Sequence, residues 1–333
     1  MSTVAAAAEA AERRRALATF TSAWASQIGI TVAFLLLWGA FVVLAPATFL
    51  SPGIYLSFAQ TTPYFALMAL PLTMVIVAGD IDLSFPSIMA LGMVGFVTVW
   101  QATGSVELGV LTALAVGLSA GLFNGLLVTY IGIPALVVTI GTQFLYRGLA
   151  LVLVGGRSFA LVDARESPVY HLLVGRLMGI PMQFFWLVLG AICVWFLLNR
   201  HRLGHNAYAI GDNRQAAQLM GVPIRRTRIA LFALTGLAAA FAGLMNSLQV
   251  VNFYPTMGDG YLLPTLAAVF VGGTSVFGGR GTIWGTFLGA FMIGGINAGI
   301  VAVGLTDYYT NLIYGAVILA SVAVHAVLQR RLQ

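Results

Sequence analysis

The sequence is a succession of apolar runs, and each run is long enough, or nearly so, to cross a lipid bilayer. A transmembrane helix needs about 20 mainly apolar residues. Breaks at glycine, proline and clustered charge divide the chain into ten predicted spans: 28–45, 62–78, 83–100, 107–131, 135–154, 183–199, 229–250, 264–278, 284–303 and 309–328. Only 8% of the 333 residues are charged, against about 25% in a soluble domain. The sequence therefore predicts an all-α polytopic membrane protein with about ten transmembrane helices in the lipid bilayer.

The arginines predict the orientation of these spans. All 16 basic residues are arginine, and basic residues concentrate on the cytoplasmic side of a membrane. With ten spans and both termini in the cytoplasm, twelve arginines lie inside and four lie outside, namely Arg147, Arg157, Arg165 and Arg176. We therefore expect a cytoplasmic tail over 1–27, a transmembrane domain over 28–328 and a second cytoplasmic tail over 329–333.

Enzymatic chemistry finds little support in the sequence. The absence of lysine excludes a phosphate-binding P-loop and a Schiff-base lysine. No HExxH or CxxC motif occurs, and the single cysteine, Cys193, lies in an apolar run. We expect no enzyme activity, no cofactor and no metal site. We attribute the isoelectric point near 9.8 to orientation in the membrane and expect no nucleic-acid partner.

Glycines recur at four-residue spacing in two places. These residues are Gly117, Gly121 and Gly125 in one span, and Gly281, Gly285 and Gly289 at another. Glycine at this spacing allows two helix backbones to approach closely within a membrane. We expect close helix packing at both faces, with a sliding seam as the alternative.

Two carboxylates interrupt the apolar pattern between the second and third predicted spans. Asp80 and Asp82 lie in the segment Gly79–Ser84, and residues at i and i+2 do not share one face of a helix. A charge beside apolar runs is costly unless it meets water, a hydrogen-bond donor or a helix N-terminus. Asp82 or Ser84 could cap the next helix, with Pro86 in its first turn. The alternative is that the carboxylates line a solute pathway at a helix break.

Uncharged amides within the spans suggest the chemistry of the solute. An amide donates and accepts hydrogen bonds without a fixed charge, which suits a neutral, hydroxyl-rich solute. The run Asn252–Pro255 adds aromatic surface near the external mouth. Any one amide could instead hold two helices together. The predicted pathway residues are Asp80, Asp82, Asn124, Gln143, Asn246, Gln249, Asn252 and Tyr254.

The segment 199–228 is predicted to be a cytoplasmic loop that contains a short helix. Asp212 or Asn213 can cap a helix over 214–220, and Gly221 can end it. The apolar face of this helix would comprise Ala216, Leu219 and Met220. Two helical turns are marginal alone, so we expect this face to dock in a groove of a partner protein. The alternative is a basic loop that lies on anionic lipid.

A second break, the glycine-rich stretch Gly272–Gly285, falls between the eighth and ninth predicted spans. No strand precedes it and no lysine follows it, so it does not match a nucleotide-binding loop. Broken helices at membrane depth are tolerated only where they are buried in protein or line a cavity. This stretch and Gly79–Ser84 occupy comparable places in the two halves of the chain. Paired helix breaks of this kind indicate a repeat interface around a central pathway.

At these segments the chain resembles the permease subunits of bacterial ATP-binding-cassette sugar importers of the ribose, xylose and galactose type. The resemblance runs from about residue 28 to residue 325. It is carried by Gly79–Ser84, Ile133–Thr142, Tyr146–Gly148, Tyr208–Asn213, Ala216–Ala217 with Gly221, and Gly272–Gly285. Family members commonly have glycine at the position of Asp80, and Val-Gly at the position of Phe85-Pro86.

The resemblance implies a permease subunit that translocates a monosaccharide, such as a pentose or hexose, across the bacterial inner membrane. It implies three partners: a cytoplasmic ATPase subunit, a periplasmic sugar-binding protein, and a second permease subunit in a homodimer or heterodimer. Contact with the ATPase is implied for Tyr208, Gly211, Asp212, Asn213, Ala216, Ala217, Leu219, Met220 and Gly221. The alternative solutes are a branched-chain amino acid, a nucleoside or an autoinducer-like sugar. The alternative mechanism is an ATP-independent secondary transporter.

Overall fold

The computed structural model describes residues 27–302 and 308–330, and helices account for most of them. The first helix is Gln27–Leu44. The labelled helices are α2 (Pro46–Phe49), α3 (Pro52–Val77), α4 (Phe85–Thr103), α5 (Val106–Leu126), α6 (Ala135–Leu153), α7 (Pro168–Val174), α8 (Met182–Asn199), α9 (Arg202–Asp212), α10 (Arg214–Leu219), α11 (Ile224–Val250), α12 (Leu262–Val271), α13 (Ile283–Ala302) and α14 (Tyr308–Arg330). A π-helical turn, Leu127–Ile131, extends α5, and the 3-10 turns are Val162–Glu166 and Asp259–Tyr261.

Four short strands form two small two-stranded sheets between the loops. β1 (Phe159–Ala160) pairs with β4 (Asn252–Phe253), and β2 (Arg176–Leu177) pairs with β3 (Ile180–Pro181). Both pairs are antiparallel. The described fold is therefore all-α, as the sequence predicts.

Each of the ten predicted spans corresponds to an apolar helix. Eight of the described helices are long and apolar enough to cross a membrane, and two shorter apolar helices, Asp259–Val271 and Tyr309–Ala323, correspond to the eighth and tenth predicted spans. The predicted tails over 1–27 and 329–333 lie almost wholly outside the described residues. The cytoplasmic location of the termini therefore stays a prediction.

Two span boundaries differ most from the prediction. α3 begins at Pro52 rather than at residue 62, and it continues through Pro63 and Pro71. Ser51 caps its start by accepting a hydrogen bond from the backbone N–H of Gly53, and prolines are tolerated in membrane helices because neighbouring groups satisfy the freed carbonyls. α12 ends at Val271 rather than at residue 278, because the glycines that follow end the helix.

The central helices are α3 and α11. Every residue of α3 from Thr62 to Val77 is buried. α11 packs against α3, α4 and α5. A Cβ atom at Gly121 of α5 would collide with the backbone carbonyl of Phe232 in α11, and one at Gly289 of α13 would collide with α12. The close packing predicted for both glycine faces is therefore confirmed, and the absence of a side chain is what allows it.

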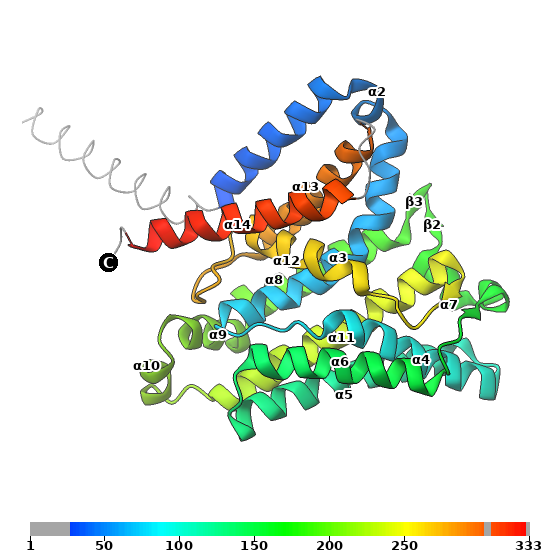
Figure 1. The fold of residues 1–333 in the computed structure, drawn as a ribbon, viewed down its shortest axis with the longest axis horizontal. Coiled ribbons are helices and arrows are strands. Elements are labelled where there is room, and N and C mark those ends of the chain that lie inside the picture. The colour runs from blue at the N-terminus through cyan, green and yellow to red at the C-terminus, as the bar shows by residue number, and fades with distance from the viewer. Residues whose placement is uncertain (1–26, 303–307, 331–333) are drawn as a thin grey trace, which may run out of the picture.

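The bundle has two distinct ends (Figure 1). α9 and α10 lie at one end, called the α10 end below. α2, α7 and the β2–β3 hairpin lie at the opposite end, called the α7 end. The long connection between α6 and α8, which carries Arg157, Arg165 and Arg176, belongs to the α7 end.

Candidate functional site

The two predicted helix breaks lie side by side at the α10 end. The backbone N–H of Gly279 donates to the carbonyl of Val77, the last residue of α3, over 2.9 Å. Gly211 of α9 lies between the breaks, where a Cβ would collide with the same carbonyl. The hydroxyl of Tyr208, also in α9, donates to the carbonyl of Gly281 over 2.6 Å. The breaks therefore pack together on α9, a helix that the sequence reasoning treated as loop.

Asp80 forms a buried ion pair with Arg228 of α11. The Nε and Nη2 atoms of Arg228 donate to the two carboxylate oxygens over 2.5 and 2.6 Å. Arg228 is 4% exposed and Asp80 is 8% exposed. Arg228 was not predicted from the sequence as the partner of Asp80. The requirement that a carboxylate beside membrane spans must meet a donor was the signal that could have led to it.

Asp82 closes the turn that precedes α4. Its Oδ1 atom accepts hydrogen bonds from the backbone N–H and the hydroxyl of Ser84, over 2.8 and 2.6 Å. Asn124 of α5 donates to that hydroxyl over 2.7 Å, and the Tyr146 hydroxyl of α6 donates to Asn124 over 2.9 Å. All four side chains are buried. Asp82 therefore locks the turn before α4 through a network that joins α4, α5 and α6, whereas Ser84, at the N-cap position, makes no side-chain capping hydrogen bond.

A cleft of about 930 Å³, with apolar and uncharged polar side chains in its lining, lies between α3, α11, α13 and α14. Among the described residues that line it, none is charged. Besides four serine and threonine hydroxyls, its polar lining includes five amides and three tyrosines: Gln60, Asn246, Gln249, Asn297, Asn311, Tyr64, Tyr261 and Tyr314. These groups can donate and accept hydrogen bonds without carrying a fixed charge.

Two of the cleft amides are held by neighbouring side chains. Asn246 donates to the hydroxyl of Tyr261 over 2.6 Å, and Gln183 of α8 donates to Gln249 over 2.6 Å. Because each bond fixes only one polar atom of the cleft amide, the other remains available to a solute. Tyr64 and Tyr261 pack edge to face, with their ring centroids 6.4 Å apart.

The structure brings only two of the eight predicted pathway residues into this cleft, Asn246 and Gln249. Asp80, Asp82 and Asn124 lie in the buried contacts described above. Gln143 is half-buried on α6, Asn252 belongs to β4, and Tyr254 follows that strand. Gln60 and the three tyrosines were not among the predicted pathway residues. Asn297 and Asn311, two amides that lie within predicted spans, were the sequence feature that could have pointed to this cleft.

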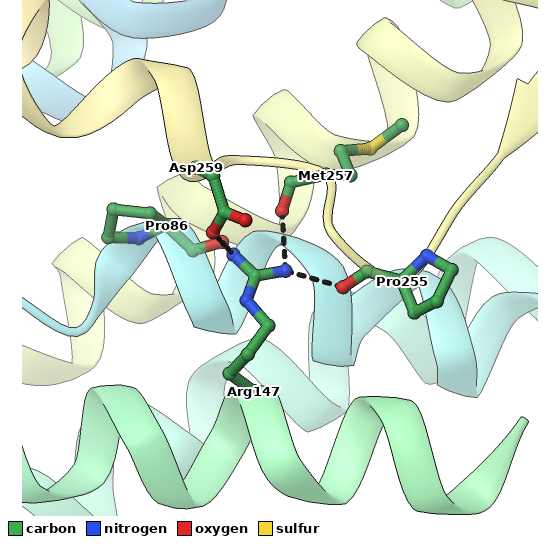
Figure 2. A network of polar contacts seen from close by, with 5 residues as sticks. All are labelled: Pro86, Arg147, Pro255, Met257 and Asp259. Atoms are coloured by element: carbon green, nitrogen blue, oxygen red, sulfur yellow. Dashed lines mark hydrogen bonds and ion pairs between the residues drawn. The ribbon is translucent and has the colours of Figure 1, made fainter. Parts of the chain in front are cut away.

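Arg147 of α6 binds the chain segment 255–259, which leads into the wall of the cleft (Figure 2). This set of contacts is called the clasp. Its guanidinium donates to the carbonyls of Pro255 and Met257, the latter over 2.8 Å, and to the carboxylate of Asp259. A longer contact of 3.4 Å reaches the carbonyl of Pro86 at the start of α4. Because Gly260 and Tyr261 line the cleft, the clasp positions one wall of it.

Replacing Arg147 with glutamine is expected to lower the stability of the protein by several kcal/mol. The reason is that the backbone carbonyls of Pro255 and Met257 would lose their donors, at about 1–3 kcal/mol for each unsatisfied buried group. Thermal unfolding in detergent measures the effect. Arg157→Gln, on the exposed loop after α6, is the matched control and is expected to unfold like the wild type. Equal unfolding temperatures for both variants would contradict the clasp.

α10 forms as the sequence predicts. Asn213 caps it by accepting a hydrogen bond from the backbone N–H of Ala216 over 3.0 Å, and Gly221 follows it with φ +77°. Ala217 faces the protein and is buried, whereas Leu219 and Met220 are 90% and 71% exposed. α10 therefore presents two large apolar side chains to its surroundings at the α10 end.

These features define the class of the protein. Ten apolar helices, two helix breaks that pack together and a cleft whose described lining carries no charge are the architecture of a polytopic membrane transport protein. The family described as "Branched-chain amino acid transport system / permease component" matches residues 54–322, and the chain belongs to this family. It is thus a transport permease rather than an enzyme, and a multi-pass protein of the bacterial inner membrane.

Two relatives are similar over most of the chain. The ribose import permease protein RbsC of Escherichia coli (strain K12) is 31% identical over 306 residues, which is 92% of this chain and 95% of the relative. The autoinducer 2 import system permease protein LsrD of Salmonella typhi is 30% identical over 270 residues, which is 80% of this chain and 81% of the relative. No solved structure matches the chain.

Proposed function

We propose that this chain is the permease subunit of an ATP-binding-cassette importer and that it translocates a monosaccharide, such as a pentose or hexose. The observation that carries the proposal is the cleft, whose described lining combines amides and tyrosines with no charged side chain. A sugar is neutral and presents several hydroxyls, each of which can donate and accept a hydrogen bond. The names of the two relatives, for ribose and autoinducer 2 import, support the same solute class.

The alternative solute of the family description, a branched-chain amino acid, fits the cleft less well. Such a solute carries a carboxylate and an ammonium group, and burying either charge without a partner is costly. The described cleft lining supplies no charged partner for either group. The cleft chemistry therefore favours a neutral solute over a zwitterionic one.

The two ends of the bundle have different roles in this proposal. The arginine bias supports an outside location for the α7 end, where a periplasmic binding protein would deliver the sugar to the cleft. α10 lies at the opposite end, and its exposed Leu219 and Met220 suit a groove on a cytoplasmic ATPase subunit. A second permease subunit completes the assembly. Hydrolysis of ATP in the partner would then drive alternating access through contacts of α9 and α10.

Uptake into proteoliposomes tests the proposal. The chain is reconstituted with its ATPase and binding protein, and we expect ATP-dependent uptake of a labelled pentose or hexose. Unlabelled sugars should compete with this uptake and leucine should not. Competition by leucine alone would overturn the solute assignment. Uptake without the ATPase would instead favour a secondary transporter.

Asn297→Leu is expected to reduce sugar uptake about 2- to 10-fold. Asn297 is an exposed cleft amide, and one hydrogen bond is worth about 0.5–1.5 kcal/mol. Gln101→Leu removes an amide from an exposed position on α4 and serves as the matched control, with uptake expected to equal that of the wild type. Equal uptake by both variants would remove Asn297 from the solute pathway.

A further inference from the structure

An apolar groove of about 980 Å³ lies on the outside of the bundle, apart from the cleft. Its walls are the first helix, the second half of α8 and the start of α13. Ala191, Ile192 and Trp284 contribute to its apolar lining. Because all three helices are membrane spans, the surface that the groove opens onto is the hydrocarbon region of the bilayer.

Polar groups gather where the groove reaches the α10 end. Arg200 and Asn199 line it at the end of α8, and Gln27 lines it at the start of the first helix. The Arg200 guanidinium lies 6.0 Å from the ring centroid of Trp195, another lining residue. The Oε1 atom of Gln27 is buried and has no hydrogen-bond partner among the described residues. The groove thus combines a long apolar wall with one cationic, hydrogen-bonding end.

Two tryptophans occupy the same region. The indole N–H of Trp284 donates to the hydroxyl of Thr31 over 3.1 Å, which joins α13 to the first helix across the groove. Tryptophans concentrate at the boundary between hydrocarbon and headgroups. The cytoplasmic leaflet is rich in anionic lipid, and arginines at that depth attract it. The described lining contains Arg200 and no carboxylate that would oppose an anion.

We propose that this groove is a binding site for an anionic phospholipid of the cytoplasmic leaflet. An acyl chain of the lipid lies along Ile192 and Ala191, and its phosphate pairs with Arg200. A hydroxyl of the headgroup donates to Gln27, whose buried oxygen has no partner among residues 27–302 and 308–330. Phosphatidylglycerol supplies both the charge and the hydroxyl.

Native mass spectrometry of the purified full-length chain tests the charge requirement. Phosphatidylglycerol and phosphatidylcholine with identical acyl chains are added separately. We expect phosphatidylglycerol to bind more tightly by about fivefold, the change that one arginine near an anionic lipid provides. Arg200→Gln should remove this preference. Arg202→Gln, an exposed arginine two residues away that does not line the groove, should retain it.

Filling the groove tests the acyl-chain requirement separately. Ala191→Trp places a large side chain in the groove and should abolish retention of phosphatidylglycerol. Equal binding of the two lipids to the wild type, or equal losses in the two arginine variants, would overturn the proposal in favour of a diffuse basic surface. Release of a second copy of the chain by Ala191→Trp, without loss of lipid, would also overturn it. The lipid readout is independent of the solute and of the ATPase.

Discussion

Replacing Arg228 with glutamine is expected to destabilise the protein by about 3–5 kcal/mol, because Asp80 would be left as a buried carboxylate without its counter-charge. The pair is bidentate, and both side chains are buried where the α3–α4 break meets the start of α11. Denaturant unfolding in detergent, followed by tryptophan fluorescence, measures the loss. Arg226→Gln removes an exposed arginine two residues away and is expected to change stability by less than about 0.5 kcal/mol.

A double variant separates the ion pair from the rest of the site. Asp80→Asn combined with Arg228→Gln removes both charges together, so no unpaired charge is left behind. We expect this double variant to be more stable than Arg228→Gln alone, since residues in contact are not additive. Strictly additive losses would show that the two side chains do not stabilise one another.

Leu219→Asp is expected to reduce ATP-dependent uptake at least about tenfold. If Leu219 docks in an apolar groove of the ATPase subunit, the substitution removes about 1.5–3 kcal/mol of apolar burial and adds a charge that must be desolvated. Folding should be unaffected, because Leu219 is 90% exposed in the subunit. The measurements are uptake and stimulation of ATP hydrolysis in the reconstituted complex.

Gln215→Asp is the matched control, because it places the same charge at another exposed position on α10. It is expected to retain most of the uptake. Wild-type stimulation of ATP hydrolysis in Leu219→Asp would contradict α10 as the docking helix. The same loss in both variants would indicate an electrostatic surface rather than an apolar one.

The sequence predicted most accurately the features that depend on residues close together in the chain. A short helix is specified by capping at Asn213, by the apolar periodicity of Ala216, Leu219 and Met220, and by the left-handed Gly221, and all of these act over a few positions. The close approach of helices at Gly121 was predicted from spacing in the same way. Its partner, Phe232 of α11, lies more than a hundred residues away and could not be identified.

The predicted pathway residues show that contacts between distant helices cannot be predicted from neighbouring residues in the sequence. Asp82 and Asn124 were chosen because polar groups are rare in spans, but their partners are Ser84 and Tyr146 rather than a cavity. Nothing within a single span distinguishes an amide that binds another helix from one that faces a cleft. The cleft amides Asn246 and Asn297 belong to α11 and α13, so only the packing of these helices makes them neighbours.

The amino-acid sequence by itself determined that this chain spans a membrane, roughly where its ten apolar helices lie and which short helix could dock on a partner. These properties follow from hydropathy, glycine, proline and capping groups, whose effects are local. Only the tertiary structure decided that Arg228 neutralises Asp80, that Arg147 holds the chain beside Tyr261, and that the uncharged amides gather in one cleft. Contacts of this kind depend on which helix faces meet, and that choice is made by the packing energy of the whole bundle.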